Sequence, residues 1–521
     1  MILSPDPTFP SARRYVLKLH RDADPASGKL IGRIENVKSG DEREFSSAAE
    51  LIAAIAVLAS TLLAGCATYP DRAPAPATEA ASSYATAKSF AAPAANWPDE
   101  AWWKGYGDAQ LDALIDEALR GSPSLAAAQA RLKRAEASAQ VSGSALLPKA
   151  SFNSSITEQK QSYNYLSPEA ATPHGWNDYG RATLDFSWEI DFWGKNRAAL
   201  AAATSELEAT RADAAQARIT LATSIASSYA ELAREYAALD TARSASAVRA
   251  KTADLFRDRN RNGVEILASV RTQESRSASA AGDVLSLEEQ IALQKNRIAA
   301  LMGAGPDRGL KIARPSINLA HGFALPSNLS ANLIGRRPDV AAARMRAQAS
   351  GKRIKQAEAA FYPNVNLAAF IGFQSFGLNM LTKGGSSVGS VGPAVTLPIF
   401  QGGALRGQLK SADADYAEAV ANYDRTLVQA LSEVADAATS QKALGPQLAR
   451  TNDAVVAARE AWQIQNNRYQ GGLSTYLDVL SAEDTLLSTL RAQSDLQSRA
   501  FSLDVALVKA LGGGYQISLN R

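Results

Sequence analysis

The sequence contains very little of the residue types that build catalytic and metal sites. Its 521 residues include one cysteine, Cys66, and three histidines that lie far apart, His20, His174 and His321. A single cysteine excludes an intrachain disulfide and a cysteine-based metal cluster. The sequence also has no Walker loop, no Ser-His-Asp set and no histidine-rich metal spacing. We therefore expect neither an enzyme nor a bound metal or cofactor.

Aromatic residues and net charge are scarce as well. Phe, Trp and Tyr make up 7% of the chain, the formal net charge is +3, and basic residues are interleaved with acidic ones. Scattered charge of this kind indicates solvated helix faces and argues against nucleic-acid binding. The chain is long enough for several ordinary domains. Its abundant alanine nevertheless favours long thin helices, because Ala-rich helices pack closely and bury little area per residue.

Long hydrophobic runs are missing apart from one near the N-terminus. Residues 51–65, LIAAIAVLASTLLAG, are too short for a transmembrane helix but have the length of the apolar core of a signal peptide. The small residues before Cys66 resemble the bacterial lipobox, in which the thiol receives a diacylglycerol and the new N-terminus is acylated. We expect this covalent lipid on Cys66 to anchor the chain. Ala67 stands where the inner-membrane retention signal has Asp, which indicates an outer-membrane lipoprotein; the alternative is a buried helix that ends on a chance cysteine.

The segments on either side of this signal show no apolar periodicity. Residues 1–50 are polar and unlike a short basic n-region, so we interpret them as an atypical extension that arises from a wrong start or a fusion. Residues 66–98 are rich in Ala, Pro and Ser, and we expect them to form an extended, acylated leader.

The rest of the chain repeats itself. The motif SPSLAAAQAR around Pro123 returns as RPDVAAARMR around Pro338, 215 residues later, and Gly263 returns as Gly472, 209 residues later. Further pairs are Pro148 with Pro363 at the first spacing, and Gly194 with Gly403 and Gly303 with Gly512 at the second. One duplicated unit with one altered loop length explains the series. We expect a first repeat at 99–304, a connector at 305–335, a second repeat at 336–514 and a tail at 515–521.

Each repeat contains two segments in which apolar and polar residues alternate, as they do in β-strands. We expect strands within residues 149–190 and 364–400; in one of them Ala182, Leu184 and Phe186 share a face. Strands of about ten residues with one apolar and one polar face are typical of a transmembrane β-barrel. A barrel must close in lipid, and four strands are too few to close one, so several copies are required.

Aromatic residues near these strands support a membrane location. Trp176, Tyr179, Trp188, Phe192 and Trp193 are expected to lie at the membrane interface, where amphipathic rings are enriched. The alternative is a soluble four-stranded β-structure packed on helices.

Residues 197–260 contain neither Gly nor Pro and predict one helix. As a single helix, this segment would be on the order of 95 Å long. Leu200, Leu207, Ala214 and Leu221 fall seven residues apart, which predicts a heptad seam. Such a helix is too long for a compact domain, so the pattern indicates a helical tube or a coiled coil. We expect the chain to reverse at 263 and again at 471–472.

Five motifs together resemble a known family. They are WWKGYGDAQLDALIDEAL, GRRPDVAAARMRAQASGKRIKQAEAAFYPNVNL, LPIFQGG, ALSEVADAA and RYQGGLSTYLDVLSAE. Over residues 97–514 the chain resembles the TolC-like outer-membrane efflux channels, and the lipobox narrows the resemblance to the lipoprotein (NodT-like) branch that serves RND-type multidrug pumps. The resemblance implies a membrane α+β fold in which three chains contribute four strands each to a 12-stranded β-barrel, continued by a long periplasmic α-helical barrel with an equatorial belt that includes residues 305–335.

The same resemblance implies the function. We expect the passive outer-membrane duct of a tripartite pump that exports drugs and other small toxic compounds. Its partners would be two further copies of the chain, a periplasmic membrane-fusion adaptor, an inner-membrane RND pump and outer-membrane lipid. One alternative is the duct of a type I protein secretion system, which shares the fold. Another is a non-conducting coiled-coil envelope lipoprotein, against which the alternating strands argue.

Two glycine turns are expected to reverse the long helices. They lie at Gly263 and at the pair Gly471 and Gly472, with Ser474 or Thr475 available to cap the returning helix. In the family these turns meet the adaptor. The resemblance therefore gives an adaptor-contact set of Arg259, Asn262, Gly263, Val264, Arg468, Gly471, Gly472, Leu473 and Ser474. The alternative is a plain hairpin turn without a partner.

Just beyond the second turn, the family places acidic residues that ring the closed pore. Asp478 matches the first such position, Ser481 stands where some members have a second acid, and Glu483 or Asp484 supplements the ring. Ser269 replaces a frequent Asp in the first turn, so the ring is expected to be thin and block by cations to be weak. Otherwise Asp478 is only a solvated residue at a helix end.

Overall fold

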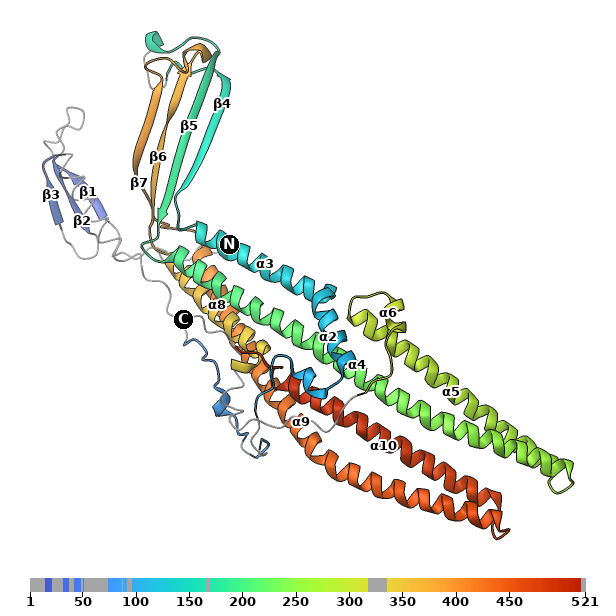
Figure 1. Ribbon diagram of the computed structural model, residues 1–521. Helices are drawn as coiled ribbons and strands as arrows, with labels where there is room; N and C mark the ends of the chain where they lie inside the picture. The colour runs from blue at the N-terminus through green and yellow to red at the C-terminus, as the bar shows by residue number, and fades with distance from the viewer. Residues whose placement is uncertain are drawn as a thin grey trace, which may run out of the picture. The chain divides into compact units, whose positions relative to one another are not determined.

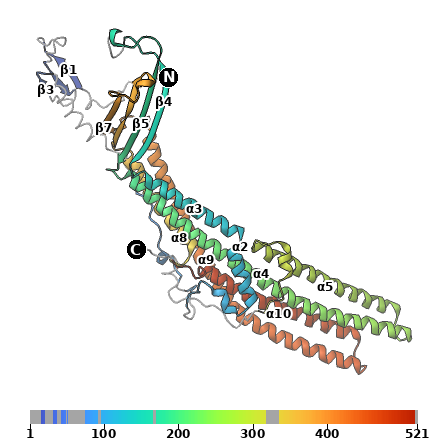
Figure 2. The ribbon, with the colours of Figure 1, turned by 45° about the horizontal axis from the view of Figure 1, so that its top comes forward.

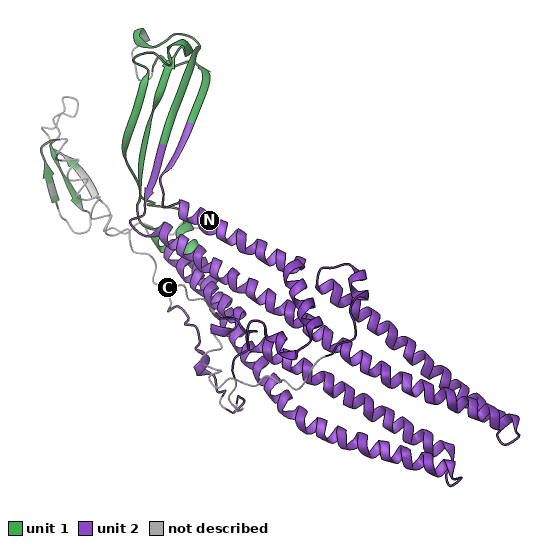
Figure 3. Cartoon of the chain, in the orientation of Figure 1, with its two compact units in different colours: residues 1–73, 153–185, 357–409 green, residues 74–152, 186–356, 410–521 purple. Residues whose placement is uncertain are grey.

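The computed structural model describes the chain between residues 15 and 516, with gaps. The described residues are 15–20, 31–36, 42–47, 50, 74–86, 88–90, 96–164, 169–316 and 335–516. They fall into two compact units, which Figure 3 colours separately: unit 1 takes residues from 1–73, 153–185 and 357–409, and unit 2 from 74–152, 186–356 and 410–521. The predicted lipidation site Cys66, the signal segment 51–65 and residues 317–334 of the connector lie outside the described residues.

In unit 1, part of the N-terminal extension forms a small antiparallel sheet. Its strands are β1 (Tyr15–Leu19), β2 (Gly32–Asn36) and β3 (Glu42–Phe45), in that order. Cross-strand ion pairs join Lys18 to Glu35 at 2.5 Å and Arg33 to Glu42 at 2.7 Å. The sequence indicated only a polar segment here, because strands this short carry too few residues to show a period.

A second sheet, most of which belongs to unit 1, takes one pair of strands from each repeat (Figure 1). It has the order β4-β5-β6-β7, with β4 (Lys149–Gln159), β5 (Asn177–Ile190), β6 (Asn364–Phe376) and β7 (Ser387–Thr396). Short 3₁₀ helices in the connecting loops are η5 (Glu169–Ala171) and η6 (Leu378–Met380). β6 and β7 pair antiparallel, from Asn364 opposite Thr396 to Phe373 opposite Ser387. β7 ends at Thr396, before the predicted limit at 400. Pro398 has no N–H with which to continue the hydrogen-bond ladder.

The two faces of this sheet differ in polarity. Large apolar side chains occupy one face, and they are exposed in the single chain: Phe152 is 71% exposed, Ile156 67% and Ile371 65%. On the other face Asn153 of β4 donates a hydrogen bond to Asp185 of β5 at 2.9 Å. A broad face of exposed apolar side chains is costly in water and requires apolar surroundings.

Unit 2 consists mainly of helices and displays the duplication. The first half contains η4 (Trp102–Tyr106), α2 (Ala109–Gly121), α3 (Pro123–Ser144), α4 (Lys195–Arg261), α5 (Leu267–Leu301) and α6 (Pro306–Leu310), after η3 (Ala81–Ser83) of the leader. The second contains α8 (Pro338–Ala359), α9 (Ala404–Gln470) and α10 (Tyr476–Ala510). α4 and α9 both have 67 residues, and α5 and α10 both have 35. These equal lengths agree with one duplicated unit.

The helices form two long antiparallel hairpins, α4–α5 and α9–α10, which lie side by side in Figures 1 and 2. A helix of this length spans about 100 Å. The heptad seam predicted on α4 accounts for only part of its packing. Leu200 lies beside Gly143 of α3, whereas the fully buried Ala209 contacts a cluster with Ala341 and Ala342 of α8. α4 thus uses a separate face for each neighbouring helix.

The largest core cluster surrounds the aromatic residues of η4. Trp102 and Trp103 pack edge to face, and so do Tyr106 and Phe501 of α10, with ring centroids 4.5 Å apart. The buried hydroxyl of Tyr106 donates a hydrogen bond to Asp504 at 2.6 Å. The WWKGYGDAQ segment therefore contacts the C-terminal part of α10.

Gly263 ends the first hairpin helix in the left-handed conformation, with φ +71°. Its N–H donates to the carbonyl of Asn260 at 2.9 Å, and the N–H of Val264 donates to Arg259 at 2.8 Å. These two bonds satisfy carbonyls at the end of α4 that have no partner within the helix.

Gly472 repeats this arrangement at the end of α9, with φ +73°. Its N–H donates to Tyr469 at 3.0 Å, and the N–H of Leu473 donates to Arg468 at 2.8 Å. The neighbouring Gly471 has no positive φ and donates to Asn467 at 3.0 Å, as an ordinary helical residue does. The two glycines of the second turn therefore have different roles, which the sequence did not separate.

The two glycines form a matched pair for a test. Gly472→Ala should destabilise the turn by about 1–2 kcal/mol, because a Cβ is unfavourable at this φ. Gly471→Ala should cost little, since its Cβ would meet the carbonyl oxygen of Asn467 at an ordinary 3.5 Å. Hydrogen exchange at the first amides of α10 reports the local opening free energy, and equal effects of the two substitutions would contradict this assignment.

Candidate functional site

The two hairpin turns expose apolar side chains to solvent. Leu473 is 73% exposed and Val264 64%, and Ile266, Leu267 and Leu477 are exposed as well. Leu473 and Val264 belong to the predicted contact set, whereas the other three were missed. Leu473 lies in the turn before α10 and Leu477 is the second residue of this helix, so no helical spacing links the two in the sequence. The two turns together thus present an apolar surface bordered by arginines.

The arginines of the predicted contact set are partly engaged within the chain. Arg259 donates to the hydroxyl of Tyr469 at 3.4 Å, which joins the first turn to the second. Arg468 donates to the carbonyl of Leu473 at 3.3 Å, and Ser474 donates to the carbonyl of Gln465 at 3.4 Å. Ser474 therefore does not cap α10.

Asn262 and the glycines complete the set. Asn262 is the C-cap residue of α4 and is exposed, as are Gly263, Gly471 and Gly472. All nine members of the predicted set lie at the two turns, within four residues of Gly263 or Gly471. The structure thus brings the set together; what it contacts in an assembly stays a prediction.

An aromatic cluster joins the hairpins just before the turns. Tyr476 of α10 packs against Phe256 of α4 at 5.3 Å between ring centroids and against Tyr469 of α9 at 5.0 Å. Its hydroxyl also hydrogen-bonds with that of Thr252. Burial raises the pKa of Tyr476, so this hydroxyl stays protonated at neutral pH. The first and second repeats are therefore held together near their turns.

Asp478 is the third residue of α10 and forms a capping box with Thr475, the N-cap residue of this helix. Its carboxylate accepts hydrogen bonds from the backbone N–H of Thr475 at 2.9 Å and from the Thr475 hydroxyl at 2.8 Å. These hydrogen bonds hold the pKa of the exposed Asp478 carboxyl below its usual range. Asp478 thus bears a full negative charge at neutral pH and also has a structural task at the helix end.

The other two predicted gate positions differ from Asp478. Ser481 is exposed and uncharged, and Asp484 is exposed but forms an ion pair with Arg249 of α4. The charge of Asp484 is therefore compensated within the chain. Asp478 is the one predicted gate residue of the described chain that carries a negative charge without an ion pair; whether it rings a pore stays a prediction.

Glu483 is placed differently from its neighbours. It is only 5% exposed, and both carboxylate oxygens are buried without a hydrogen-bond partner among the described residues. Burial raises the pKa of this carboxyl; Asp484 adds to the shift, while Arg249 and Arg276 oppose it. Glu483 therefore faces the helix packing and does not supplement an exposed ring as the sequence suggested.

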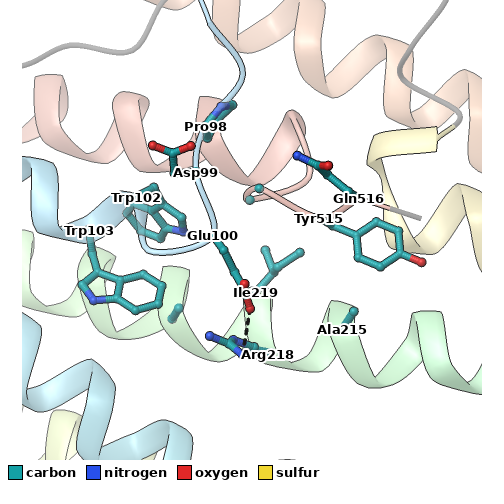
Figure 4. Close-up of a pocket in the computed structure, with 13 residues that line it drawn as sticks. Pro98, Asp99, Glu100, Trp102, Trp103, Ala215, Arg218, Ile219, Tyr515 and Gln516 are labelled. Carbon is teal, nitrogen blue, oxygen red and sulfur yellow. Dashed lines mark ion pairs between the residues drawn. The ribbon is translucent and has the colours of Figure 1, made fainter. Parts of the chain in front are cut away.

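A cavity in unit 2 lies among other residues. It has a volume of about 400 Å³ and is lined by Trp102, Ile219 and Tyr515, with an ion pair of 3.0 Å between Glu100 and Arg218 at its edge (Figure 4). None of the predicted site residues lines it. Within the described residues, no group of three or more His, Cys, Asp or Glu side chains is arranged to hold a metal ion. Among the described helices, none is both long and apolar enough to cross a membrane.

Comparisons with known proteins agree on one family. The sequence profile named "Outer membrane efflux protein" matches residues 114–304 and 329–513. The fusaric acid resistance protein FusA of Burkholderia cepacia is 37% identical over 69% of this chain and 69% of its own length. The multidrug resistance outer membrane protein MdtP of Escherichia coli K12 is 30% identical over 81% of this chain and 87% of its own.

A solved structure shows the same fold. The outer membrane protein VceC of Vibrio cholerae superposes with a TM-score of 0.76 and 51% sequence identity, covering 81% of this chain and all of VceC. The predicted fold class is confirmed: a membrane α+β protein in which the repeats supply one four-stranded sheet, β4 to β7, together with long helices.

Glu483 gives a pH-dependent test of this geometry. The folded state binds the proton of this carboxyl more tightly than the unfolded state, so its contribution to stability is largest at low pH and is lost as pH rises above the ordinary carboxyl pKa of 4.5. Glu483→Gln should flatten that decline and raise the melting temperature at neutral pH. Asp484→Asn is the comparison and should flatten it much less, because Asp484 is a smaller cause of the shift than burial. A Glu483→Gln profile that follows the unsubstituted protein would contradict the burial of this carboxyl.

Proposed function

The chain belongs to the outer membrane efflux protein family, and we propose that three copies of it form a passive exit duct for drugs and other small toxic compounds. It is an outer-membrane channel component of an efflux system, like the relatives that it matches. Among these relatives, MdtP and FusA are named for resistance to multiple drugs and to fusaric acid, which supports a drug-like cargo.

The single observation that carries this proposal is the open four-stranded sheet. β4 and β7 are edge strands among the described residues, and the apolar face of the sheet is exposed. In lipid, unpaired N–H and C=O groups on such edges cost several kcal/mol each, so the sheet must close. The smallest ordinary barrels have about eight strands, which one chain cannot supply. Three copies would supply twelve.

The helices also present free faces to further copies. α4 contacts α5 on one side through the hydrogen bond of Gln294 to Ser228, and α10 on the other through the ion pair of Arg234 with Asp495. α5 and α9 then form the two ends of the row, and each exposes apolar residues. These are Leu285 and Leu293 on α5, and Val456 and Ile464 on α9. In a closed ring, α5 of one copy would pack against α9 of the next.

The partners and the lipid complete the proposal. The exposed apolar turns fit a periplasmic membrane-fusion adaptor, which would connect the duct to an inner-membrane RND pump. That pump would supply the energy, so the duct needs no catalytic site. Cys66 would carry S-diacylglycerol and N-acyl groups that hold the leader at the membrane.

Three measurements test the duct. Crosslinking of the purified protein should give a trimer, planar bilayers should show ion-conducting channels, and deletion should increase drug susceptibility. A protein that forms no channel in bilayers would instead be a structural envelope lipoprotein. Co-purification with candidate adaptors and pumps identifies its system, and partners from a protein-secretion system would redirect the assignment.

The turns provide a matched pair for the adaptor. Leu473→Asp places a charge on the exposed apolar turn and should weaken adaptor binding by about tenfold or more, as loss of a central contact does. Leu310→Asp alters an equally exposed leucine on α6, away from the turns, and should leave binding unchanged. Binding is measured by pull-down of the purified trimer, and retention of the adaptor by Leu473→Asp would contradict docking at the turns.

Asp478 can be tested in two steps, because it caps a helix and is also a predicted gate. Asp478→Asn removes the charge but keeps an oxygen for the N–H of Thr475, so block of single-channel current by cations should disappear while α10 stays intact. Asp478→Ala should lose the block as well and also destabilise the helix end by about 1 kcal/mol. Unchanged conductance and cation block in Asp478→Asn would end the gate assignment.

A further inference from the structure

The polar face of the four-stranded sheet carries few charges. Contacts across the strands identify this face: Asn153 to Asp185 joins β4 to β5, and Arg181 over Phe370 joins β5 to β6. The register of β6 and β7 adds Ser390, which lies opposite Phe370. By strand alternation the strand residues of this face are neutral apart from Lys149, Arg181, Asp185 and Glu189.

Three of these four charged residues either have a polar partner or lie at the end of a strand. Asp185 accepts hydrogen bonds from Asn153 and Thr183, both at 2.9 Å. Glu189 forms an ion pair of 2.5 Å with Lys195. Lys149 is the first residue of β4. The hydrogen bonds of Asp185 and the ion pair of Glu189 are therefore made with neighbours other than Arg181.

Arg181 itself forms no ion pair in the part of the chain that the structure describes. Its guanidinium lies over the ring of Phe370, 5.2 Å from the centroid. A cation at this distance from an aromatic face is attracted by the ring but keeps its full charge. Arg181 thus contributes a positive charge that no ion pair among the described residues neutralises, although Asp185 lies near enough for the two charges to interact.

The neighbouring residues fix this arrangement. On one side, Tyr179 donates to Gln374 at 3.2 Å and packs on Phe376 at 5.5 Å between centroids, which fills the next level of the same face. Beyond Phe370 on β6 stands Gly372, where an added Cβ would lie 2.1 Å from the carbonyl oxygen of Ala182. β6 therefore approaches β5 closely beside Arg181, and a bulkier residue at 372 would push the two strands apart.

We propose that Arg181, held on Phe370, is a specificity-determining residue of the duct, in which three copies form a cationic ring that favours anionic over cationic solutes. The inference rests on the proposed trimeric duct, in which the apolar face meets lipid and the polar face lines the lumen. Rings of arginine or lysine select anions in pores because the wall has a low dielectric constant and screens the charges little. The three copies of Asp185, further along β5, would form a separate ring of negative charge.

The test is the reversal potential of the purified trimer in a planar bilayer under a KCl gradient. Arg181→Gln should lower the ratio of chloride to potassium permeability about threefold at moderate salt, the size expected of three partly screened charges. Arg181→Lys keeps the charge and should keep the ratio. Asp185→Asn should shift the ratio in the opposite direction. Every variant is repeated in an Asp478→Asn background, so that carboxylates at the turns do not mask an effect in the barrel.

The outcomes separate this inference from the duct itself. Channels of Arg181→Gln with an unaltered reversal potential in both backgrounds would overturn the role of Arg181 and leave the duct standing. Loss of the preference in Arg181→Lys as well would show that the charge is not what selects. A chain that conducts no ions would overturn the duct and this role together.

Discussion

Unpaired backbone groups at the edges of the four-stranded sheet are the constraint on which the other features depend. In the described part of one chain, β4 and β7 each leave a row of N–H and C=O groups without a strand partner. Water can satisfy such groups, whereas lipid cannot. The exposed apolar face excludes water as the natural surroundings of the sheet. Closure into a barrel with further copies pairs the edge strands and places the apolar face against lipid. The folded chain is then one subunit of an oligomer.

The helices show the same incompleteness in a milder form. α4 is packed on two sides because it lies inside a row, whereas α5 and α9 each have one packed and one open side. An open helix face costs only its apolar area, because every backbone hydrogen bond is made within the helix. The strands therefore demand assembly, and the helices only favour it. Contacts such as Tyr476 with Phe256 bind the two repeats of one chain before any second copy is involved.

The sequence predicted the fold well because the duplication doubles every signal. The turn at Gly263 is ambiguous alone, but its counterpart at Gly472 makes both credible, and the structure gives both glycines a positive φ. Packing direction was harder to foresee. Glu483 and Asp484 are adjacent in sequence, yet one is buried and the other exposed, because a helix rotates about 100° per residue and the neighbouring helix decides which side is covered. The sequence did not indicate a role for Arg181, because its partner Phe370 lies in the other repeat.

The two open edges also have a consequence for biogenesis. A newly exported chain carries β4 and β7 at the margins of its sheet before any partner has arrived, and exposed edges pair readily with whatever strand they meet. Assembly competes with aggregation during this interval, and both processes depend on concentration. The helical repeats can form from local contacts meanwhile, since these need no second chain. The time that a chain spends alone, rather than its folding speed, then limits how much functional duct a cell obtains.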